Sequence, residues 1–214
     1  MKFSYILSAF LASLSIASPI DERLTQVASR DVQAAAEPGE VYAISARDDV
    51  PNDDTPNYTA ATKAHTPLVN GKYYWFWLQW PRDPVGDGDG ESAAEIKALR
   101  DALGFNHVGV VVGQIKETPQ GKGKNAKLKR DFIAELHHMI EIKGSTNTGI
   151  IQRQYDYKNK DSDKVLVWGG ETTASKAAAA KKFAKAWTDV EAQKTYNVKT
   201  NNCDTFAKAV KGKL

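Results

Sequence analysis

The sequence predicts an α+β fold, because segments typical of strands and of amphipathic helices both occur from residue 72 onward. Residues 72–80, KYYWFWLQW, are dense in aromatic side chains, and residues 107–115, HVGVVVGQI, are rich in valine, as expected of strands. Residues 172–194 are rich in alanine and lysine, and a last helix is expected to begin near Cys203. We therefore expect a sheet packed against helices. The apolar face of the first of these helices comprises Phe183, Trp187 and Val190.

Further strands and one more helix are expected between these segments. Aliphatic runs predict three strands, over residues 136–142, 149–157 and 164–170. Ser92 and Glu95 form a capping box at the start of a helix, and Gly104 is expected to end it. Residues 120–130, QGKGKNAKLKR, predict a mobile basic loop. At its end, Lys129-Arg130 resembles a dibasic processing site.

The N-terminal part of the chain has the composition of an export signal followed by an arm. Residues 1–17 join a lysine to an apolar run and small residues, which predicts a secretory signal peptide. Residues 18–66 lack periodicity, so we expect a propeptide or a loosely ordered arm. Residues 67–214 should then form a single domain. The sequon Asn57-Tyr58-Thr59 agrees with a secreted, extracellular glycoprotein.

Charge and hydropathy argue against several classes of function. The net charge is +3, and it falls to +2 when Lys2 leaves with the signal peptide. A balance that small does not indicate nucleic acid or an anionic membrane surface as a partner. No later segment is apolar enough to span a bilayer, so we expect no stable membrane anchor. The acidic loop of residues 81–90 lacks EF-hand spacing, and we expect neither a metal nor a cofactor.

Cys203 is the single cysteine of the chain, and it stands at the expected start of the last helix. An odd thiol in a secreted protein indicates a reactive group or an intermolecular link, although a buried, inert cysteine is common. Asn201 or Asn202 would cap the helix, and Phe206 and Val210 share the face of the cysteine. Free amides and the helix dipole favour a thiolate there and could hold an oxyanion. These are the requirements of a nucleophile.

His107 is the candidate base for such a nucleophile, because a catalytic thiolate usually works with an imidazole. Strand periodicity places His107, Gly109 and Val111 on one face of the sheet. The glycine leaves room beside the imidazole for a backbone or a substrate. One histidine alone is more often a surface or core residue, so the argument depends on the combination with Cys203.

Two short motifs together resemble a known arrangement. Residues 107–111, HVGVV, and residues 202–206, NCDTF, with Tyr196 upstream, resemble the circularly permuted papain-like cysteine enzymes. These include the lecithin:retinol acyltransferase-like and PPPDE peptidase families, which are related to the NlpC-type peptidases. The resemblance covers roughly residues 72–214 by layout. It implies a papain-like core, with an antiparallel sheet packed against helices and the histidine strand before the cysteine helix. It also implies Cys203 as nucleophile and His107 as base.

The resemblance further implies a third polar residue, on a neighbouring strand, that orients the imidazole. The candidates are His137, His138 and Glu141. Strand alternation groups His138 with Leu136 and Ile140 on an apolar, inward face, and places His137 and Glu141 on the other. A glutamate after two apolar residues also resembles some family members. We prefer His138, with Glu141 next, and a bulge could reverse the choice.

These observations predict a secreted thiol hydrolase that cleaves peptide or isopeptide bonds. Cys203 would attack the acyl carbon to give a thioester, and His107 would hold the proton and return it to the leaving group. The expected partner is a peptide, isopeptide or acyl substrate, and the chain should be a monomer. An acyltransferase or a lipid hydrolase on the same fold is the first alternative.

Three other interpretations stay open at the level of sequence. The chain could be a non-catalytic secreted binding or effector protein on the same scaffold. It could form a disulfide-linked dimer through Cys203. A zinc site made by His107, His138 and Cys203 ranks below catalysis, because no spacing requires it.

Overall fold

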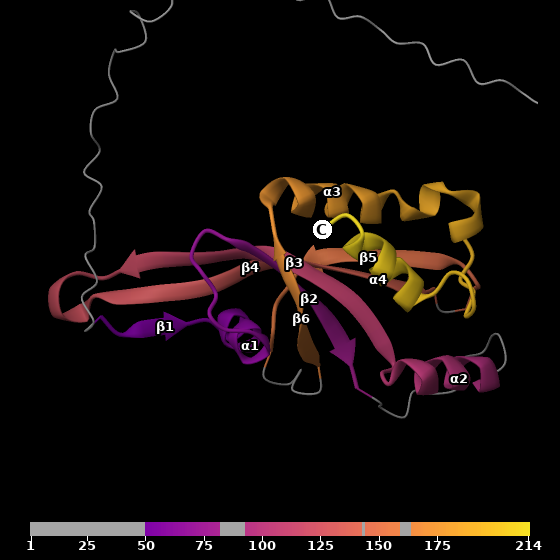
Figure 1. Cartoon of the computed structure of the whole chain (residues 1–214), viewed down its shortest axis with the longest axis horizontal. Helices are drawn as coiled ribbons and strands as arrows, with labels where there is room; N and C mark the ends of the chain where they lie inside the picture. Colours follow the sequence, from indigo (N-terminus) through magenta and orange to yellow (C-terminus); the bar gives the residue numbers. More distant parts are fainter. Residues whose placement is uncertain (1–49, 82–92, 143, 159–163) are drawn as a thin grey trace, which may run out of the picture. The chain divides into compact units, whose positions relative to one another are not determined.

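The computed structural model describes residues 50–81, 93–142, 144–158 and 164–214, with the backbone alone for residues 93–96. The expected signal peptide, most of the arm, the acidic loop and the capping residue Ser92 lie outside the described residues. The folded unit runs from Asp48 to Leu214. It is a mixed α and β structure, as the sequence predicts, and Figure 1 labels its elements in chain order.

A six-stranded sheet forms the centre of this unit. Its path is β1-β4-β3-β2-β6, and β5 pairs with a second part of β4. All pairings are antiparallel except that of β1 with β4. The strands are β1 (Asn52–Asp54), β2 (Tyr73–Trp80), β3 (His107–Gln120), β4 (Lys127–Glu141), β5 (Thr148–Gln154) and β6 (Val165–Thr172).

Helices cover both faces of the sheet. Helix α1 packs against β4 and β6 on one face, and α4 packs against β3 and β4 on the other, beside α3. Figure 1 shows α3 and α4 above the sheet and α1 below it. Because helices cover both faces of the sheet, the valines of β3 form a continuous run that does not alternate with polar residues. The helices are α1 (Pro56–Ala64), α2 (Ala93–Leu103), α3 (Ala174–Lys185) and α4 (Cys203–Lys211).

Two hydrophobic cores lie on the two faces of the sheet. We call them the α1-side core and the α4-side core. The α1-side core includes Tyr58, Phe76, Leu78, Val111, Phe132 and Leu136. The α4-side core includes Trp75, Val108, Val110, Met139, Cys203 and Phe206. Alternate residues of β3 therefore enter opposite cores, as the period of a strand requires.

The expected mobile loop of residues 120–130 is largely a β-hairpin, so this expectation is wrong. Strand β3 continues to Gln120, β4 begins at Lys127, and cross-strand pairs hold the two together. Strand β1 pairs with the far side of β4, where Arg130 forms a two-point ion pair with Asp54 at 2.6 and 2.8 Å. The lysines look like a loop in the sequence because they are partly exposed strand residues. The peptide bond after Arg130 lies within three paired strands, and its processing stays a prediction.

The folded unit begins before residue 67, where the sequence placed the domain boundary. Residues 52–64 form β1 and α1, and Tyr58 and Ala61 are buried. The Thr55 side chain caps α1 by accepting from the Tyr58 amide, with Pro56 at the first helical position. This polar, proline-containing segment resembles an arm in the sequence because its few apolar residues are buried only by contact with distant strands.

Asn57, the acceptor of the sequon, has its side chain engaged in the fold. Its Nδ2 donates to the carbonyl of Tyr155 at 3.1 Å and to that of Phe132 at 3.4 Å. Its Oδ1 accepts from the amide of Tyr157 at 2.7 Å. We call this arrangement the Asn57 clamp. A glycan on Nδ2 would replace one of the donated hydrogens, so the sequon is a poor acceptor in the folded protein. Glycosylation itself stays a prediction.

The expected long helix of residues 172–194 is shorter in the structure. Helix α3 ends at Lys185, and two 3-10 turns follow. Trp187 is buried and donates to Asn201, but Val190 is 53% exposed, so it does not belong to the packed face. The helix expected before Gly104 is confirmed, since α2 ends at Leu103 and Gly104 has a φ of 82°.

Candidate functional site

The start of α4 matches the sequence expectation. Helix α4 begins at Cys203, and Asn202 rather than Asn201 caps it. Asn202 Oδ1 accepts from the amides of Asp204 and Thr205, each at 3.0 Å, and Thr205 Oγ1 accepts from the Asn202 amide at 2.8 Å. Asn201 serves the loop instead, by donating to Thr148 at 3.1 Å. The cysteine is therefore held at the first turn of a well-capped helix.

The Cys203 thiol is buried, and its acidity differs from the expectation. The residue is 4% exposed and packs in the α4-side core. Burial raises the thiol pKa, and backbone N–H groups, including that of Val108, oppose this only in part. Desolvation can shift a pKa by 3–5 units, whereas a helix terminus contributes about 0.3–1 kcal/mol, which is less than one unit. The burial effect therefore dominates, and the thiol stays protonated at neutral pH.

Tyr196 and Glu141 belong to the surroundings of the thiol. Burial raises the pKa of the Tyr196 phenol, and the nearby Cys203 and Glu141 raise it further. Glu141 follows Met139 by two residues on β4, so it lies on the α4 side of the sheet. Glu141, one of the two preferred candidates for the residue that orients the imidazole, thus lies on the same face as the thiol. The neutral Tyr196 phenol is near both Glu141 and Cys203.

The two histidines of the predicted site contact each other on the opposite face. His107 Nε2 and His138 Nδ1 are 2.8 Å apart, a hydrogen-bond distance. Strand pairing explains the contact, because Gly109 lies opposite His138 and His107 is two residues away on the same face. A Cβ on Gly109 would lie 2.9 Å from the Cβ of His138, so the glycine allows the two strands to pair this closely.

The imidazoles and the thiol are separated by strand β3. His107 and His138 pack on the ring of Trp80, with centroid distances of 4.6 and 5.5 Å. Trp80 packs on the α1-side core, whereas Val108 and Cys203 belong to the α4-side core. The structure therefore joins His107 to His138 and places Cys203 near Tyr196, but it does not direct the His107 ring toward the thiol. Alternation had grouped His107 with Gly109 and Val111 correctly, and α4 covers the other face.

Burial keeps this histidine pair neutral. The pKa of His107 is lowered to about 4 by burial. The pKa of His138 is lowered to about 3, mainly by burial and further by His107, Arg153 and Lys164. His138 is 8% exposed, and its Nε2 has no hydrogen-bond partner among the residues that the structure describes. The pair thus carries one unsatisfied ring nitrogen in a positively charged neighbourhood.

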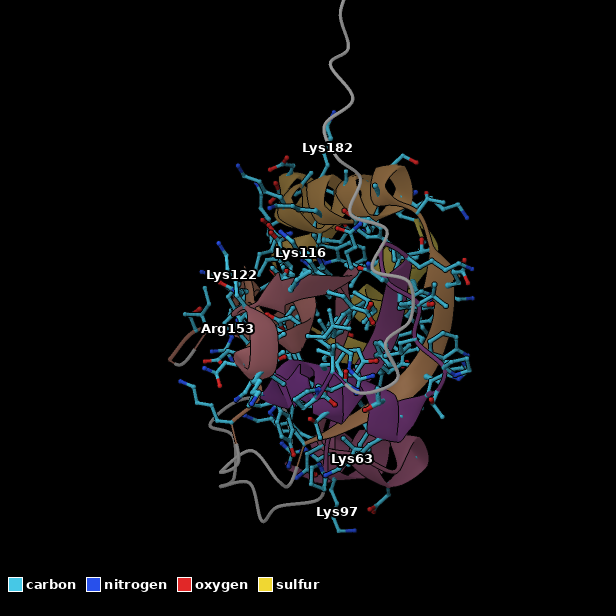
Figure 2. The ribbon with its side chains drawn as sticks, turned by 90° about the vertical axis from the view of Figure 1, so that its left-hand side faces the viewer. Lys63, Lys97, Lys116, Lys122, Arg153 and Lys182 are labelled. Carbon is cyan, nitrogen blue, oxygen red and sulfur yellow. The ribbon has the colours of Figure 1, made fainter. Side chains whose placement is uncertain are left out.

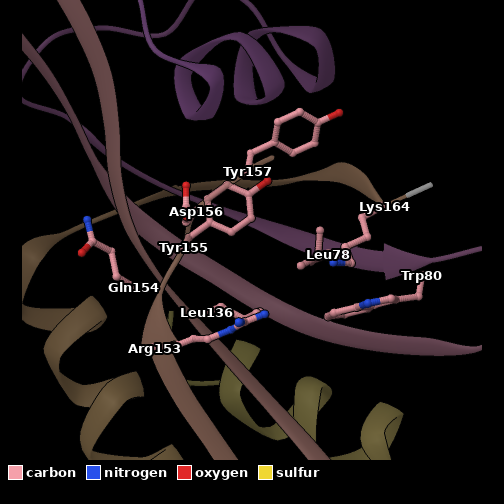
Figure 3. A pocket seen from close by; sticks show the side chains of 9 residues that line it. All are labelled: Leu78, Trp80, Leu136, Arg153, Gln154, Tyr155, Asp156, Tyr157 and Lys164. Atoms are coloured by element: carbon pink, nitrogen blue, oxygen red, sulfur yellow. The ribbon is translucent and has the colours of Figure 1, made fainter. Parts of the chain in front are cut away.

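A small pocket is lined by Trp80, against whose ring both imidazoles pack, and we call it the Trp80 pocket (Figure 3). Arg153 of β5 and Lys164, just before β6, extend toward Trp80 from different segments (Figure 3). The Lys164 Nζ lies 5.9 Å from the Trp80 ring centroid. Asp156 also lines the pocket, but it pairs with Lys158 at 3.3 Å. The space, about 20 Å³, holds one water molecule or one oxygen of a ligand.

Arg153 and Lys164 are functional candidates that the sequence analysis did not select. Arg153 is exposed, and it makes no hydrogen bond or ion pair with another described residue. The β4–β5 pairing puts Arg153 opposite Leu136 and Ile151 opposite His138, on the histidine face. Alternation within residues 149–157 could have indicated this, but the pairing register was needed to relate Arg153 to His138.

His137 lies on the α4 side, and it is as buried as His138. It is 0% exposed, with Gln152 Nε2 at 3.1 Å from its Nδ1. Strand alternation alone predicts one inward face for this strand, but helices cover both faces of the sheet. Among the described residues, no three His, Cys, Asp or Glu side chains gather as a metal site would require. Cys203 is on the other face from His107 and His138, so these three do not form the zinc alternative.

Comparison with known proteins finds no family model, no curated protein and no solved structure that matches the chain. No comparison therefore bears on the relationship to papain-like enzymes, which stays a prediction from the short sequence motifs. The part of the chain with described coordinates contains no helix both long and apolar enough to cross a bilayer.

Proposed function

We propose that this protein is a non-catalytic, secreted binding protein, and that it binds an anionic group at the Trp80 pocket. The observation that carries the proposal is the separation of the buried Cys203 thiol from the His107–His138 pair by strand β3. A thiol that is protonated and faces away from its base cannot act as the expected nucleophile. Arg153, which lines the Trp80 pocket and makes no hydrogen bond or ion pair with another described residue, is the group left with unused binding capacity.

The chemistry of the Trp80 pocket favours an oxyanion. Arg153 offers a planar fork of donors that matches a carboxylate, sulfate or phosphate group, and Lys164 adds a second cation. The neutral His138 is near enough to Arg153 and Lys164 for both to lower its pKa, but it does not line the pocket. An anion would offset the positive charge of Arg153, since Asp156 of the pocket lining is already paired with Lys158. The small volume fits one oxygen of an anionic group, whose other atoms would lie outside the pocket.

Calorimetric titration of the full chain with sodium sulfate and sodium phosphate tests this function. Sodium chloride at matched ionic strength controls for screening. Arg153→Gln and Lys164→Gln should each weaken binding about tenfold, the value of one charge-assisted hydrogen bond. Lys182→Gln is the matched control, because Lys182 is exposed on α3, apart from Arg153 (Figure 2). Equal affinities for wild type and both pocket variants would contradict the proposal.

A thiol hydrolase acting on amide bonds is the second candidate function. The capped helix start at Cys203 and the hydrogen bond between His107 and His138 favour it, since both match the arrangement that the sequence motifs resemble. Catalysis would require the start of β3 to rearrange, so that the His107 ring moves to the α4 side. The papain-like relationship belongs to this candidate.

Alkylation of Cys203 by iodoacetamide at neutral pH distinguishes the two functions. For a binding protein, we expect native alkylation to be at least about tenfold slower than alkylation in urea, because the thiol is buried and protonated. His107→Gln should leave the native rate unchanged. A native rate above that of a free cysteine, lowered by His107→Gln, would favour the hydrolase. Peptide hydrolysis that Cys203→Ala abolishes would overturn the binding proposal.

A further inference from the structure

Strand β6 ends the path of the sheet, so one of its two edges has no neighbouring strand among the described residues. Its backbone pairs with β2 and forms no backbone hydrogen bond with any other described segment. A bulge at Gly169 shifts the register near the end of the strand, and residues 165–168 form its regular part. The unpaired N–H and C=O groups of such an edge match another extended chain, which defines the class of partner.

A second open edge, at the end of β3, is protected against pairing, whereas the edge of β6 is not. Strand β2 pairs with β3 only as far as Gln114, and residues 116–120 continue beyond it. This segment, KETPQ, contains two charges and a proline, and the Glu117 amide donates to the Asn70 side chain at 3.0 Å. Residues 165–170, VLVWGG, contain neither a charge nor a proline. Strand β6 therefore lacks the side chains that usually prevent edge-to-edge contact.

Two exposed valines give the edge of β6 an apolar strip. Val165 is 51% exposed and Val167 is 37% exposed, whereas Leu166 between them is buried. Val167 lies opposite Trp77, which packs against the α4-side core, so both valines are on the α4 side of the sheet. Single exposed valines are common on protein surfaces, but these two share one face of an unprotected edge.

The edge of β6 is complementary to itself. If two β6 strands pair antiparallel about Leu166, Val165 of each copy lies opposite Val167 of the other, on one face. The contact covers all four valines, and no like charges meet because residues 165–170 are uncharged. A shift by one residue would set side chains of opposite faces against each other. The same surface thus serves both copies, as a twofold axis requires.

We infer that two copies of this chain pair through β6, with Val165 of each opposite Val167 of the other. The sequence alone predicts a monomer, and the buried Cys203 has no part in this contact. One strand pair is small beside the interface of a stable dimer, so we expect a dissociation constant of about 10–100 µM. The inference goes beyond the proposed anion site, because residues 165–168 do not line the Trp80 pocket. Each can therefore fail its test without affecting the other.

Sedimentation of the full chain under reducing conditions tests the dimer, at concentrations from about 5 to 500 µM. The wild type should change from monomer to dimer over this range. Val167→Lys should weaken the dimer at least about tenfold, because it places a charge on the paired edge. Val190→Lys is the matched control, since Val190 is an equally exposed valine outside the sheet, and it should leave the affinity unchanged. A monomer at every concentration, or equal effects of the two variants, would overturn the inference.

Hydrogen exchange of the wild type gives a second readout that does not depend on a variant that folds. The outward amides of residues 165–168 should exchange about three- to tenfold more slowly at the highest concentration than at the lowest. The amides of residues 116–120, on the protected edge of β3, should keep the same rates. Protection that grows with concentration elsewhere but not in residues 165–168 would mean that another surface forms the dimer.

Cross-linking tests the register. Val165→Cys mixed with Val167→Cys should form a disulfide-linked heterodimer on oxidation, because opposite residues have Cα atoms within the range of a disulfide. Either variant alone should cross-link much more slowly, since two copies of one position would be diagonal neighbours, about 7–8 Å apart. Cys203 is buried and does not compete. Equal rates for the mixture and for either single variant would overturn this pairing.

Discussion

The two faces of the sheet contain the two halves of what the sequence presented as one site. The α1 side has His107 bonded to His138 beside two cations, and the α4 side has Cys203 with Tyr196 nearby. His107 and Val108 are adjacent, yet their side chains enter opposite environments. The comparison teaches that a catalytic pair inferred from motifs needs the correct face as well as the correct elements.

The largest expected effect comes from removing an aromatic ring from either core. Phe206→Ala and Phe132→Ala should each lower the free energy of unfolding by about 3–5 kcal/mol, because both rings are fully buried. Since both cores share the strands of one sheet, urea unfolding followed by fluorescence and by circular dichroism should show one transition. Two separate transitions in Phe206→Ala would mean that the α4 side unfolds independently of the α1 side.

The next effect is a loss of stability in acid that involves both faces. In the folded protein the pKa values of His107 and His137 are lowered to about 4 and that of His138 to about 3, whereas a histidine of the unfolded chain has a pKa near 6.5. Below about pH 6.5 the unfolded chain therefore binds more protons than the folded protein does. Stability is complete above about pH 6.5 and falls as the pH approaches 4, by about 1–3 kcal/mol per histidine.

Urea unfolding at about pH 7, 6 and 5 measures this dependence, over a range where most carboxylates stay ionised. His137→Gln and His138→Gln should each flatten it, one for each face of the sheet. Constant stability of the wild type over this range would show that the imidazoles are more hydrated than their burial implies.

The smallest effect concerns the clamp on the α1 side. Asn57→Ala should cost about 1–3 kcal/mol, because it leaves the buried Tyr155 and Phe132 carbonyls without their donor. Thr59→Ala removes the same sequon but should change stability by less than about 0.5 kcal/mol, since Thr59 is exposed. Thermal unfolding compares the two. Equal losses would show that the sequon, rather than the clamp, supports the fold.

The Asn57 clamp also holds the segment that lines the Trp80 pocket, so Asn57→Ala should weaken sulfate binding as well.

Local features of the fold could be predicted from the sequence, and features that depend on distant contacts could not. Capping chemistry located the start of α4, and Gly104 located the end of α2, because both signals act within one helical turn. Alternation also predicts His138 on the face of Leu136, and the structure confirms it, because Leu136 belongs to the α1-side core and the His138 ring stacks on Trp80, which packs against that core. In each case the residues that determine the feature are only a few positions apart in the chain.

The face of His107 could not be predicted, because alternation groups side chains without saying which helix covers them. The acidity of Cys203 could not be predicted either, because the burial that raises its pKa comes from strands about a hundred residues earlier in the chain. The basic segment before Phe132 looked mobile for a related reason. Its order comes from pairing with β3 on one side and β1 on the other.

The parallel pairing of β1 with β4 has a consequence for the order in which the protein assembles. Arg130 and Asp54 are 76 positions apart, and their contact needs β4 to be already in place. Neighbouring hairpins close small loops, whereas this contact closes a large one at a higher entropic cost. We therefore expect β1 to be the last strand to dock during folding. For as long as it stays undocked, the outer edge of β4 beside Leu128 would offer unpaired backbone groups to any other extended chain.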